Sequence, residues 1–210
     1  MKKFLKIFFF SFLSLIIFGC SDNNKKITVE KILLFGDSLM SGYGLPEEDH
    51  LSVVLEDNLK SEGYNIEVIN ESISGNTSLD GLDRIKETLS ELDVDLIILG
   101  LGANDMLRKI KPKQTEQNLE KMIKIIQDKN INIILAGMVA SPSNGLGYKK
   151  KFDKAFPNLA KKYDIQLIPF LLHGVALKPE LNLSDGMHPN EKGVLIISET
   201  IKKSVIKILD

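Results

Sequence analysis

The sequence of 210 residues contains no tryptophan, a single cysteine and three histidines, and its formal net charge is −1. With Cys20 alone, no disulfide can form within the chain and no zinc site can be built from cysteines. The balance of charges lacks the basic excess typical of nucleic-acid-binding proteins and the acidic excess typical of disordered tails. Hydrophobic residues make up 43% of the chain, which suffices for one domain with its own core.

The first 19 residues have the pattern of an export signal. Three lysines precede an apolar run from Ile7 to Phe18, and as a helix this run would extend about 18 Å, well short of the roughly 30 Å hydrocarbon core of a bilayer. The run ends in Gly19-Cys20, which resembles the lipobox of bacterial lipoproteins, and the polar stretch SDNNKK follows. We therefore expect a lipoprotein-type signal peptide over residues 1–19 and a tether over residues 20–30.

The lipobox resemblance implies lipidation of Cys20 and a bacterial envelope protein that faces the periplasm. Ser21 follows the cysteine where Asp is the usual signal for inner-membrane retention, which favours the outer membrane. The alternative is a cleaved signal in which Cys20 is incidental.

Beyond the tether, short apolar runs alternate with helical patterns. Strands are expected at residues 31–35, 66–70, 95–101, 131–139 and 165–170. Helices are expected between them at residues 50–63, 79–91, 114–130 and 148–163, and a last one from Asn190 to the end. This alternation predicts an α/β fold, with a mostly parallel five-stranded sheet covered by helices on both faces.

In such sheets, ligands bind outside the carboxyl ends of the strands, so the loops that follow the strands are the candidate site. The first of these loops carries Ser38 in GDSLMSGYG, and a serine nucleophile needs a base and a group that orients the base. His188 lies in DGMHPN, three residues after Asp185. A turn with this spacing can place the carboxylate beside Nδ1 and leave Nε2 facing Ser38. His173 has no carboxylate at this spacing, and His50, which follows Glu47 by three residues, opens an expected helix instead of ending a loop after a strand.

Acyl transfer also needs hydrogen-bond donors for an oxyanion. The loop SISGNTS offers the backbone N–H of Gly75, and the loop GLGAND offers the side-chain amide of Asn104. The backbone N–H of Ser38 would be a third donor. Taken singly, Gly75 could be an ordinary turn glycine and Asn104 a loop cap.

Four motifs occur in a fixed order, each after an expected strand: GDS at 36–38, the glycine of SGNTS, GxND at 102–105 and DGxHP at 185–189. Together they resemble the SGNH, or GDSL, hydrolase family, most closely its branch of acyl-CoA thioesterase I, lysophospholipase L1 and arylesterase. The resemblance implies a three-layer, flavodoxin-like α/β/α domain over residues 31–210 and a catalytic triad of Ser38, His188 and Asp185. It also implies an oxyanion hole formed by Ser38, Gly75 and Asn104, and no metal or organic cofactor.

These motifs predict a serine esterase or thioesterase that hydrolyses acyl esters through an acyl-enzyme. We expect the protein to be a monomer. The loops after the strands carry apolar residues that favour an acyl chain as the bound group, namely Met106, Leu107, Ile110 and Leu146. These side chains could instead pack on the core, and a carbohydrate O-deacetylase with the same triad is the alternative.

Two further interpretations remain open. Asp37, Asp105, Asp185 and His188 could form a divalent-metal site for phosphate chemistry. Otherwise Asp37 and Asp105 are expected to tie loops together by hydrogen bonds. The protein could also be a lipoprotein that binds a ligand without catalysis.

Overall fold

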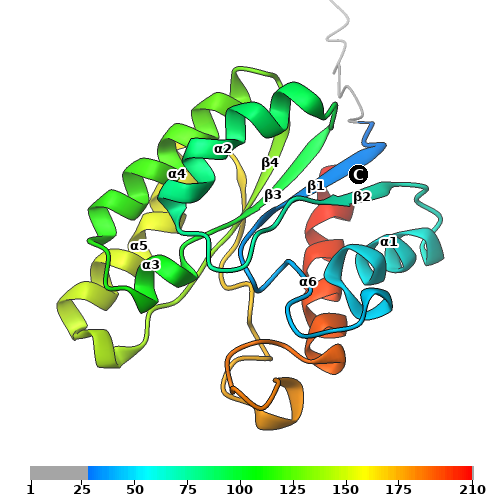
Figure 1. The fold of residues 1–210 in the computed structure, drawn as a ribbon. Helices are drawn as coiled ribbons and strands as arrows, with labels where there is room; N and C mark the ends of the chain where they lie inside the picture. The colour runs from blue at the N-terminus through cyan, green and yellow to red at the C-terminus, as the bar shows by residue number, and fades with distance from the viewer. Residues whose placement is uncertain (1–27, 210) are drawn as a thin grey trace, which may run out of the picture.

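The computed structural model describes residues 28–209, in which a five-stranded sheet lies between two layers of helices (Figure 1). The strands lie in the order β2-β1-β3-β4-β5, and every neighbouring pair is parallel. The prediction of an α/β fold with a parallel sheet is therefore confirmed. The strands are β1 (Lys31–Gly36), β2 (Glu67–Asn70), β3 (Leu96–Gly100), β4 (Asn132–Ala136) and β5 (Gln166–Ile168).

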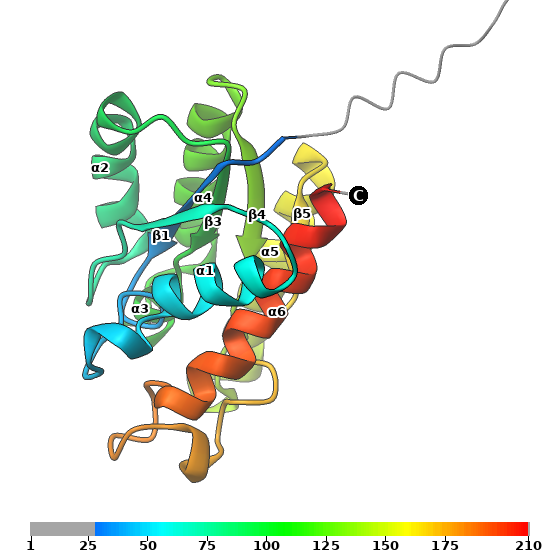
Figure 2. The same ribbon diagram turned by 90° about the vertical axis from the view of Figure 1, so that its right-hand side faces the viewer.

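Helices cover both faces of the sheet (Figures 1 and 2). One layer consists of α2 (Ser78–Glu91), α4 (Pro112–Gln127) and α5 (Leu146–Tyr163), and α4 packs against both of its neighbours. In the other layer α1 (Leu51–Ser61) packs against α6 (Glu191–Leu209). A short helix, α3 (Ala103–Leu107), and 3-10 turns at Glu47–Asp49, Pro142–Asn144 and Pro179–Leu181 lie in the loops. Across residues 28–209, no helix has the length and apolar character needed to cross a membrane.

The central strands are apolar along their whole length because helices cover both of their faces. Residues 32–35 of β1 and 96–99 of β3 have no exposed surface. The chain runs from β1 outward to β2 on one side and then returns to β3 on the other. The carboxyl ends of β1 and β3 therefore flank the point where the strand order reverses, which is where ligands bind in open α/β sheets.

Several expected elements have different bounds in the structure, and the helix expected at 114–130 spans Pro112–Gln127. The strands expected at 131–139 and 165–170 are shorter, and beyond them single hydrogen bonds continue the pairing, from Gly137 N–H to the Ile168 carbonyl and from Leu171 N–H to the Gly137 carbonyl. The helix expected at 148–163 begins two residues earlier and continues through Pro157. The sequence did not indicate α3, because five residues are too few to show helical periodicity.

The expected signal peptide (1–19) and Cys20 lie outside the described residues. The expected tether (20–30) overlaps them only in residues 28–30. Val29 is buried in the core, and the N–H groups of Glu30 and Lys31 donate to Oδ2 of Asp95 at 2.8 and 2.9 Å. The last residues of the expected tether are therefore attached to the domain.

Candidate active site

Ser38 lies in a tight turn directly after β1. The turn forms because the N–H groups of Met40 and Ser41 both donate to the Asp37 carbonyl at 3.1 Å. Gly36 is required just before it, since a Cβ there would lie 2.7 Å from Sδ of Met40 and 2.8 Å from the Gly100 carbonyl of the neighbouring strand. The strand thus delivers Ser38 to the carboxyl edge of the sheet, where its side chain is partly exposed.

Asp37 supports this turn from inside the protein. Its Oδ1 accepts the N–H of Leu39 at 3.1 Å, whereas its Oδ2 is buried without a hydrogen-bond partner. Burial raises the pKa of Asp37 to about 7, and the Leu39 hydrogen bond opposes this rise only in part. These contacts agree with the structural role that the sequence suggested for Asp37.

Ser38, His188 and Asp185 form a continuous chain of hydrogen bonds. Nε2 of His188 lies 2.9 Å from Oγ of Ser38, and Nδ1 lies 2.6 Å from Oδ2 of Asp185. Ser38 and His188 are 150 residues apart in the sequence, and the fold brings their side chains together. The serine hydroxyl thus faces one nitrogen of the ring and the carboxylate faces the other.

The loop that carries His188 is arranged around the Asp185 carboxylate. Oδ1 of Asp185 accepts the N–H groups of Met187 at 2.8 Å and His188 at 3.0 Å. These two bonds, His188 first, together with the bond to the His188 ring, lower the pKa of Asp185 to about 2. The carboxylate therefore stays ionised beside the imidazole from neutral pH down to about pH 2.

A ring contact and a helix cap support the segment that carries His188. The ring of Tyr43 packs against the imidazole, with centroids 4.3 Å apart and planes tilted by 37°. Asn190, two residues later, accepts the N–H groups of Lys192 and Gly193 at 3.1 Å and so closes the first turn of α6. The imidazole thus packs on Tyr43, and the chain after His188 leads directly into α6.

The two proposed oxyanion donors outside Ser38 belong to adjoining segments. Gly75 has φ +84°, a left-handed conformation that strains any residue with a side chain. Nδ2 of Asn104, in α3, donates to the Asn76 carbonyl at 3.1 Å, and Arg108, one turn later, donates to the Gly75 carbonyl at 2.8 Å. α3 therefore holds the Gly75–Asn76 segment at two points, and the Asn104 side chain also lies close enough to Asp37 to counteract in part the rise in the pKa of that carboxyl.

Asp105 is a buried structural residue. Its carboxylate accepts the N–H and the hydroxyl of Ser78 at 2.7 and 2.5 Å, and the hydroxyl of Thr115 at 2.9 Å. It thus joins α3 to the start of α2 and to α4. Of the four residues considered for a metal site, Asp185 and His188 bind each other, whereas Asp37 and Asp105 make their hydrogen bonds elsewhere. No group of three or more His, Cys, Asp or Glu is placed to hold a metal within residues 28–209.

The four residues expected to contact an acyl chain lie on α3, on the loop after it and at the start of α5. Met106 and Ile110 are partly buried, whereas Leu107 is 56% and Leu146 is 78% exposed. Their segments are joined because the Asn144 amide donates to the Met106 carbonyl at 3.0 Å and the Tyr148 hydroxyl donates to the Ile110 carbonyl at 2.9 Å. The two exposed leucines thus lie on neighbouring segments.

Sequence reasoning missed Tyr43 and Arg108. No sequence pattern pointed to Tyr43, because its contact with His188 depends on how two loops that are distant in the sequence pack together. Arg108 lies four residues after Asn104, so an expected α3 would have placed both side chains on one helix face.

Comparisons with known proteins agree with this geometry. Residues 34–195 match the GDSL-like Lipase/Acylhydrolase family. An arylesterase of Vibrio mimicus is 38% identical over 94% of this chain and 98% of its own length. The thioesterase 1/protease 1/lysophospholipase L1 of Escherichia coli K12 is 33% identical over 84% of this chain and 83% of its own.

A solved structure of similar fold is the psychrotrophic esterase EstA from Pseudoalteromonas, in a form inhibited by monoethylphosphonate. It superimposes with a TM-score of 0.80 and 32% identity, over 85% of this chain and 97% of its own. The family indicated by the sequence motifs is confirmed. The chain belongs to the GDSL-like lipase/acylhydrolase family.

Proposed function

We propose that the protein is a serine hydrolase that cleaves acyl esters or thioesters through a covalent acyl-enzyme. The observation that carries this proposal is the hydrogen-bonded chain from Ser38 through His188 to Asp185. His188 takes the proton of the Ser38 hydroxyl as its oxygen attacks the substrate carbonyl, and then gives that proton to the leaving group. Water activated by the same histidine attacks the acyl-enzyme and releases the acid.

Asp185 acts through the histidine. Its bond to Nδ1 fixes the tautomer that leaves Nε2 free to accept the serine proton, and its charge stabilises the imidazolium that forms. Because its pKa is held at about 2, this support persists throughout the neutral and mildly acidic range.

The oxyanion of the tetrahedral intermediate would be bound by the N–H groups of Ser38 and Gly75 and by the Asn104 amide. This role is supported by the left-handed backbone at Gly75 and by the anchoring of its carbonyl to Arg108. Donors fixed before the reaction cost no reorganisation when the charge develops.

The relatives favour acyl substrates. One is named an arylesterase and another a thioesterase and lysophospholipase, and neither name favours the carbohydrate O-deacetylase alternative.

A phosphonate probe tests the serine chemistry directly. A fluorophosphonate should label the protein at Ser38 and abolish hydrolysis of p-nitrophenyl esters, as expected for a relative of an esterase inhibited by monoethylphosphonate. EDTA should leave the activity unchanged. Activity lost with EDTA would favour the metal interpretation, and a folded protein that neither hydrolyses esters nor is labelled would favour a non-catalytic binding protein.

Acyl-chain length should affect the rate. Each methylene removed from water contributes about 0.8 kcal/mol, so contact with Leu107 and Leu146 should raise kcat/KM from acetyl to medium-chain esters. The measurement is kcat/KM for esters of two to twelve carbons, in the wild type and in Leu107→Asp, which should flatten the profile. A flat or falling profile in the wild type, unmoved by the substitution, would instead favour the deacetylase.

We also propose that the protein is a lipoprotein held at the periplasmic leaflet of the outer membrane through Cys20. The support is the lipobox-like Gly19-Cys20 after an apolar run and the serine that follows it. Several acyl chains would then anchor the enzyme stably, since a single chain binds a bilayer only marginally. Cys20→Ser should release the protein from membranes or stall its processing. A correctly cleaved Cys20→Ser protein that still fractionates with membranes would disprove the anchor.

A further inference from the structure

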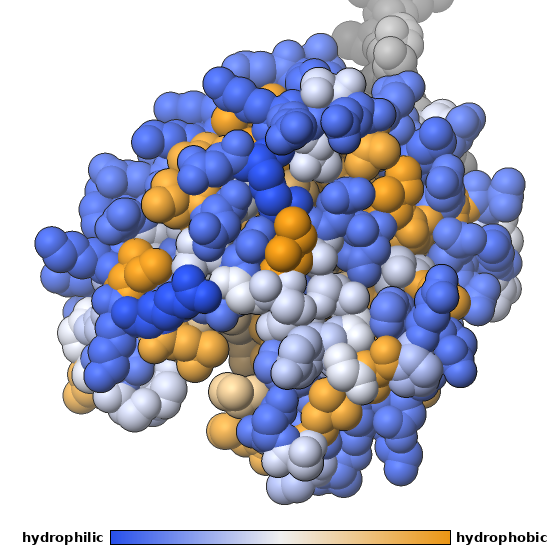
Figure 3. Space-filling view, in the orientation of Figure 1, coloured by the Kyte–Doolittle hydropathy of each residue, from blue (hydrophilic) through white to orange (hydrophobic). Residues whose placement is uncertain are grey.

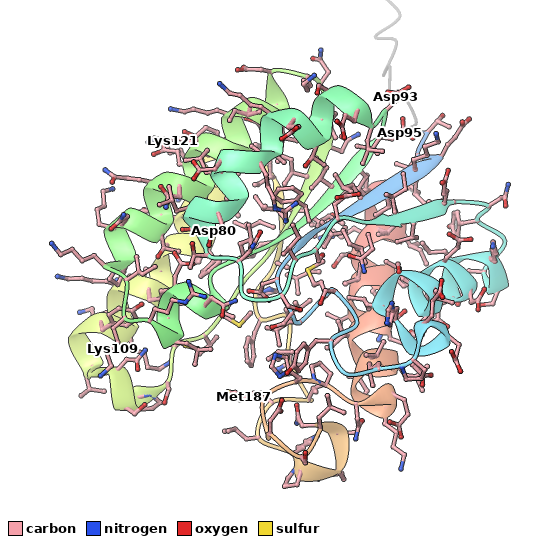
Figure 4. All side chains as sticks on the ribbon, in the orientation of Figure 1. Asp80, Asp93, Asp95, Lys109, Lys121 and Met187 are labelled. Carbon is pink, nitrogen blue, oxygen red and sulfur yellow. The ribbon has the colours of Figure 1, made fainter. Side chains whose placement is uncertain are left out.

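The formal net charge of −1 conceals a separation of charge along the chain. Residues 28–105 contain four Lys and Arg against 17 Asp and Glu, whereas residues 106–164 contain 13 against five. The second segment forms α4 and α5, which pack together on one side of the molecule. In Figure 4, Lys109 and Lys121 lie on that side together with Asp80 of the neighbouring α2, while Asp93 and Asp95 lie at the far end of the domain. The protein therefore has a basic side and an acidic side.

Several of the lysines on the basic side are not neutralised by a neighbouring carboxylate. Lys113, Lys149 and Lys162 pair with acidic side chains. In the part of the chain that the structure describes, nine further lysines of this segment are exposed and make no ion pair, among them Lys109, Lys111 and Lys150.

Two exposed leucines lie among these three lysines. Leu107 ends α3 two residues before Lys109, and Leu146 begins α5 four residues before Lys150. The hydrogen bonds from Asn144 and Tyr148 to the α3 segment bring the two stretches together. We name the five residues that share this edge the basic corner: Leu107, Lys109, Lys111, Leu146 and Lys150.

The basic corner borders the candidate active site. Asn104 and Leu107 belong to the same short helix, and Arg108 between Leu107 and Lys109 donates to the carbonyl of Gly75. Over α3 and the start of α5, Figure 3 shows hydrophobic and hydrophilic residues side by side, next to a hollow in the surface. A group bound at the basic corner would therefore lie close to the candidate active site around Ser38.

We propose that the basic corner docks on the surface of an anionic phospholipid bilayer, from which acyl esters reach Ser38. Exposed leucines surrounded by lysines are the composition that partitions into a bilayer interface. Each lysine near an anionic surface strengthens binding roughly fivefold, and repulsion of the acidic side orients the molecule with the corner toward the lipid. The second half of the proposal rests on the ester hydrolase function proposed above.

Vesicle binding by the full-length protein tests the docking step. The test variant reverses three charges of the corner, with Lys109→Glu, Lys111→Glu and Lys150→Glu. The control variant makes the same change in net charge at exposed positions of α6 on the other face of the sheet, with Lys192→Glu, Lys203→Glu and Lys207→Glu. The N-terminal residues are identical in all three proteins, so any contribution they make to binding is shared.

The corner variant should bind phosphatidylglycerol vesicles at least tenfold more weakly than the wild type in low salt, while the control stays within about twofold. On phosphatidylcholine vesicles the three proteins should behave alike. Unchanged binding of the corner variant to phosphatidylglycerol, or an equal loss in the control, would overturn the proposal. Equal thermal unfolding of the three proteins excludes misfolding as the cause.

Hydrolysis separates docking from chemistry. A long-chain ester carried in phosphatidylglycerol vesicles should be cleaved about tenfold more slowly by the corner variant, whereas a soluble short-chain p-nitrophenyl ester should be cleaved at the wild-type rate. An equal loss on soluble acyl-CoA without vesicles would show that the lysines recognise a charged substrate and would overturn the docking proposal. A wild type that cleaves neither ester would refute the proposed function, and the binding assay would still decide the docking step.

Discussion

Ser38→Ala and His188→Ala should each lower kcat by about 10⁴–10⁶, and the double variant should lose little more than either single one. The reason is the hydrogen-bonded chain in which the serine hydroxyl has His188 as its base. Without the base, the hydroxyl is a weak nucleophile, and without the hydroxyl, the base has no proton to take. The measurement is kcat for a p-nitrophenyl ester with the three variants and the wild type.

His173→Ala is the matched control, because His173 is exposed and lies on a loop after β5. It should retain nearly the full rate. Near-normal turnover by Ser38→Ala would show that another residue is the nucleophile. Losses that multiply in the double variant would show that Ser38 and His188 act independently rather than as one unit.

Asn104→Ala should fold normally and lower kcat by about 10²–10³, the effect of removing one oxyanion donor. One N–H of its amide donates to the Asn76 carbonyl, and we expect the second N–H to bind charge that develops in the transition state. Because the ground-state ester carries less charge on this oxygen, KM should change little. Steady-state kinetics on esters of one chain length separates the two constants.

Asn144→Ala provides the comparison for Asn104→Ala. Its amide also ties a loop to a backbone carbonyl, that of Met106 in the same short helix, but we assign it no part in the chemistry. It should lower kcat by far less. If Asn104→Ala changed only KM, or if both variants lost the same rate, Asn104 would have to be regarded as a loop anchor and not as an oxyanion donor.

The sequence indicated the parallel sheet because continuous apolar runs such as 32–35 and 96–99 are typical of strands buried on both faces. It also indicated which histidine faces Ser38, because Asp185 and His188 lie within one turn and their hydrogen bonds are local. Local patterns of this kind are fixed by a few neighbouring residues. They can therefore be recognised before the fold is known.

The properties that the sequence did not indicate depend on distant segments. The rise in the pKa of Asp37 follows from burial under loops that are far from it in the chain. The packing of Tyr43 on His188 requires two loops to close over the site. The positive and negative charges cancel in the net charge, and the positive charge gathers on one side because α4 and α5 pack against each other. Each of these properties depends on residues from distant parts of the fold, and no short sequence motif indicates it.

The described chain enters the sheet at the amino end of β1, whereas Ser38 follows its carboxyl end. A strand of six residues extends about 20 Å, and the seven residues from Ser21 to Ile27 reach at most about 25 Å. With Cys20 anchored as proposed, an upright molecule would hold its catalytic serine about 20 Å or more above its own bilayer, within range of dissolved esters only. Lipid esters of that bilayer come within range only when the molecule lies on its side. The length of the linker would therefore help to decide which of the two pools of substrate Ser38 can reach.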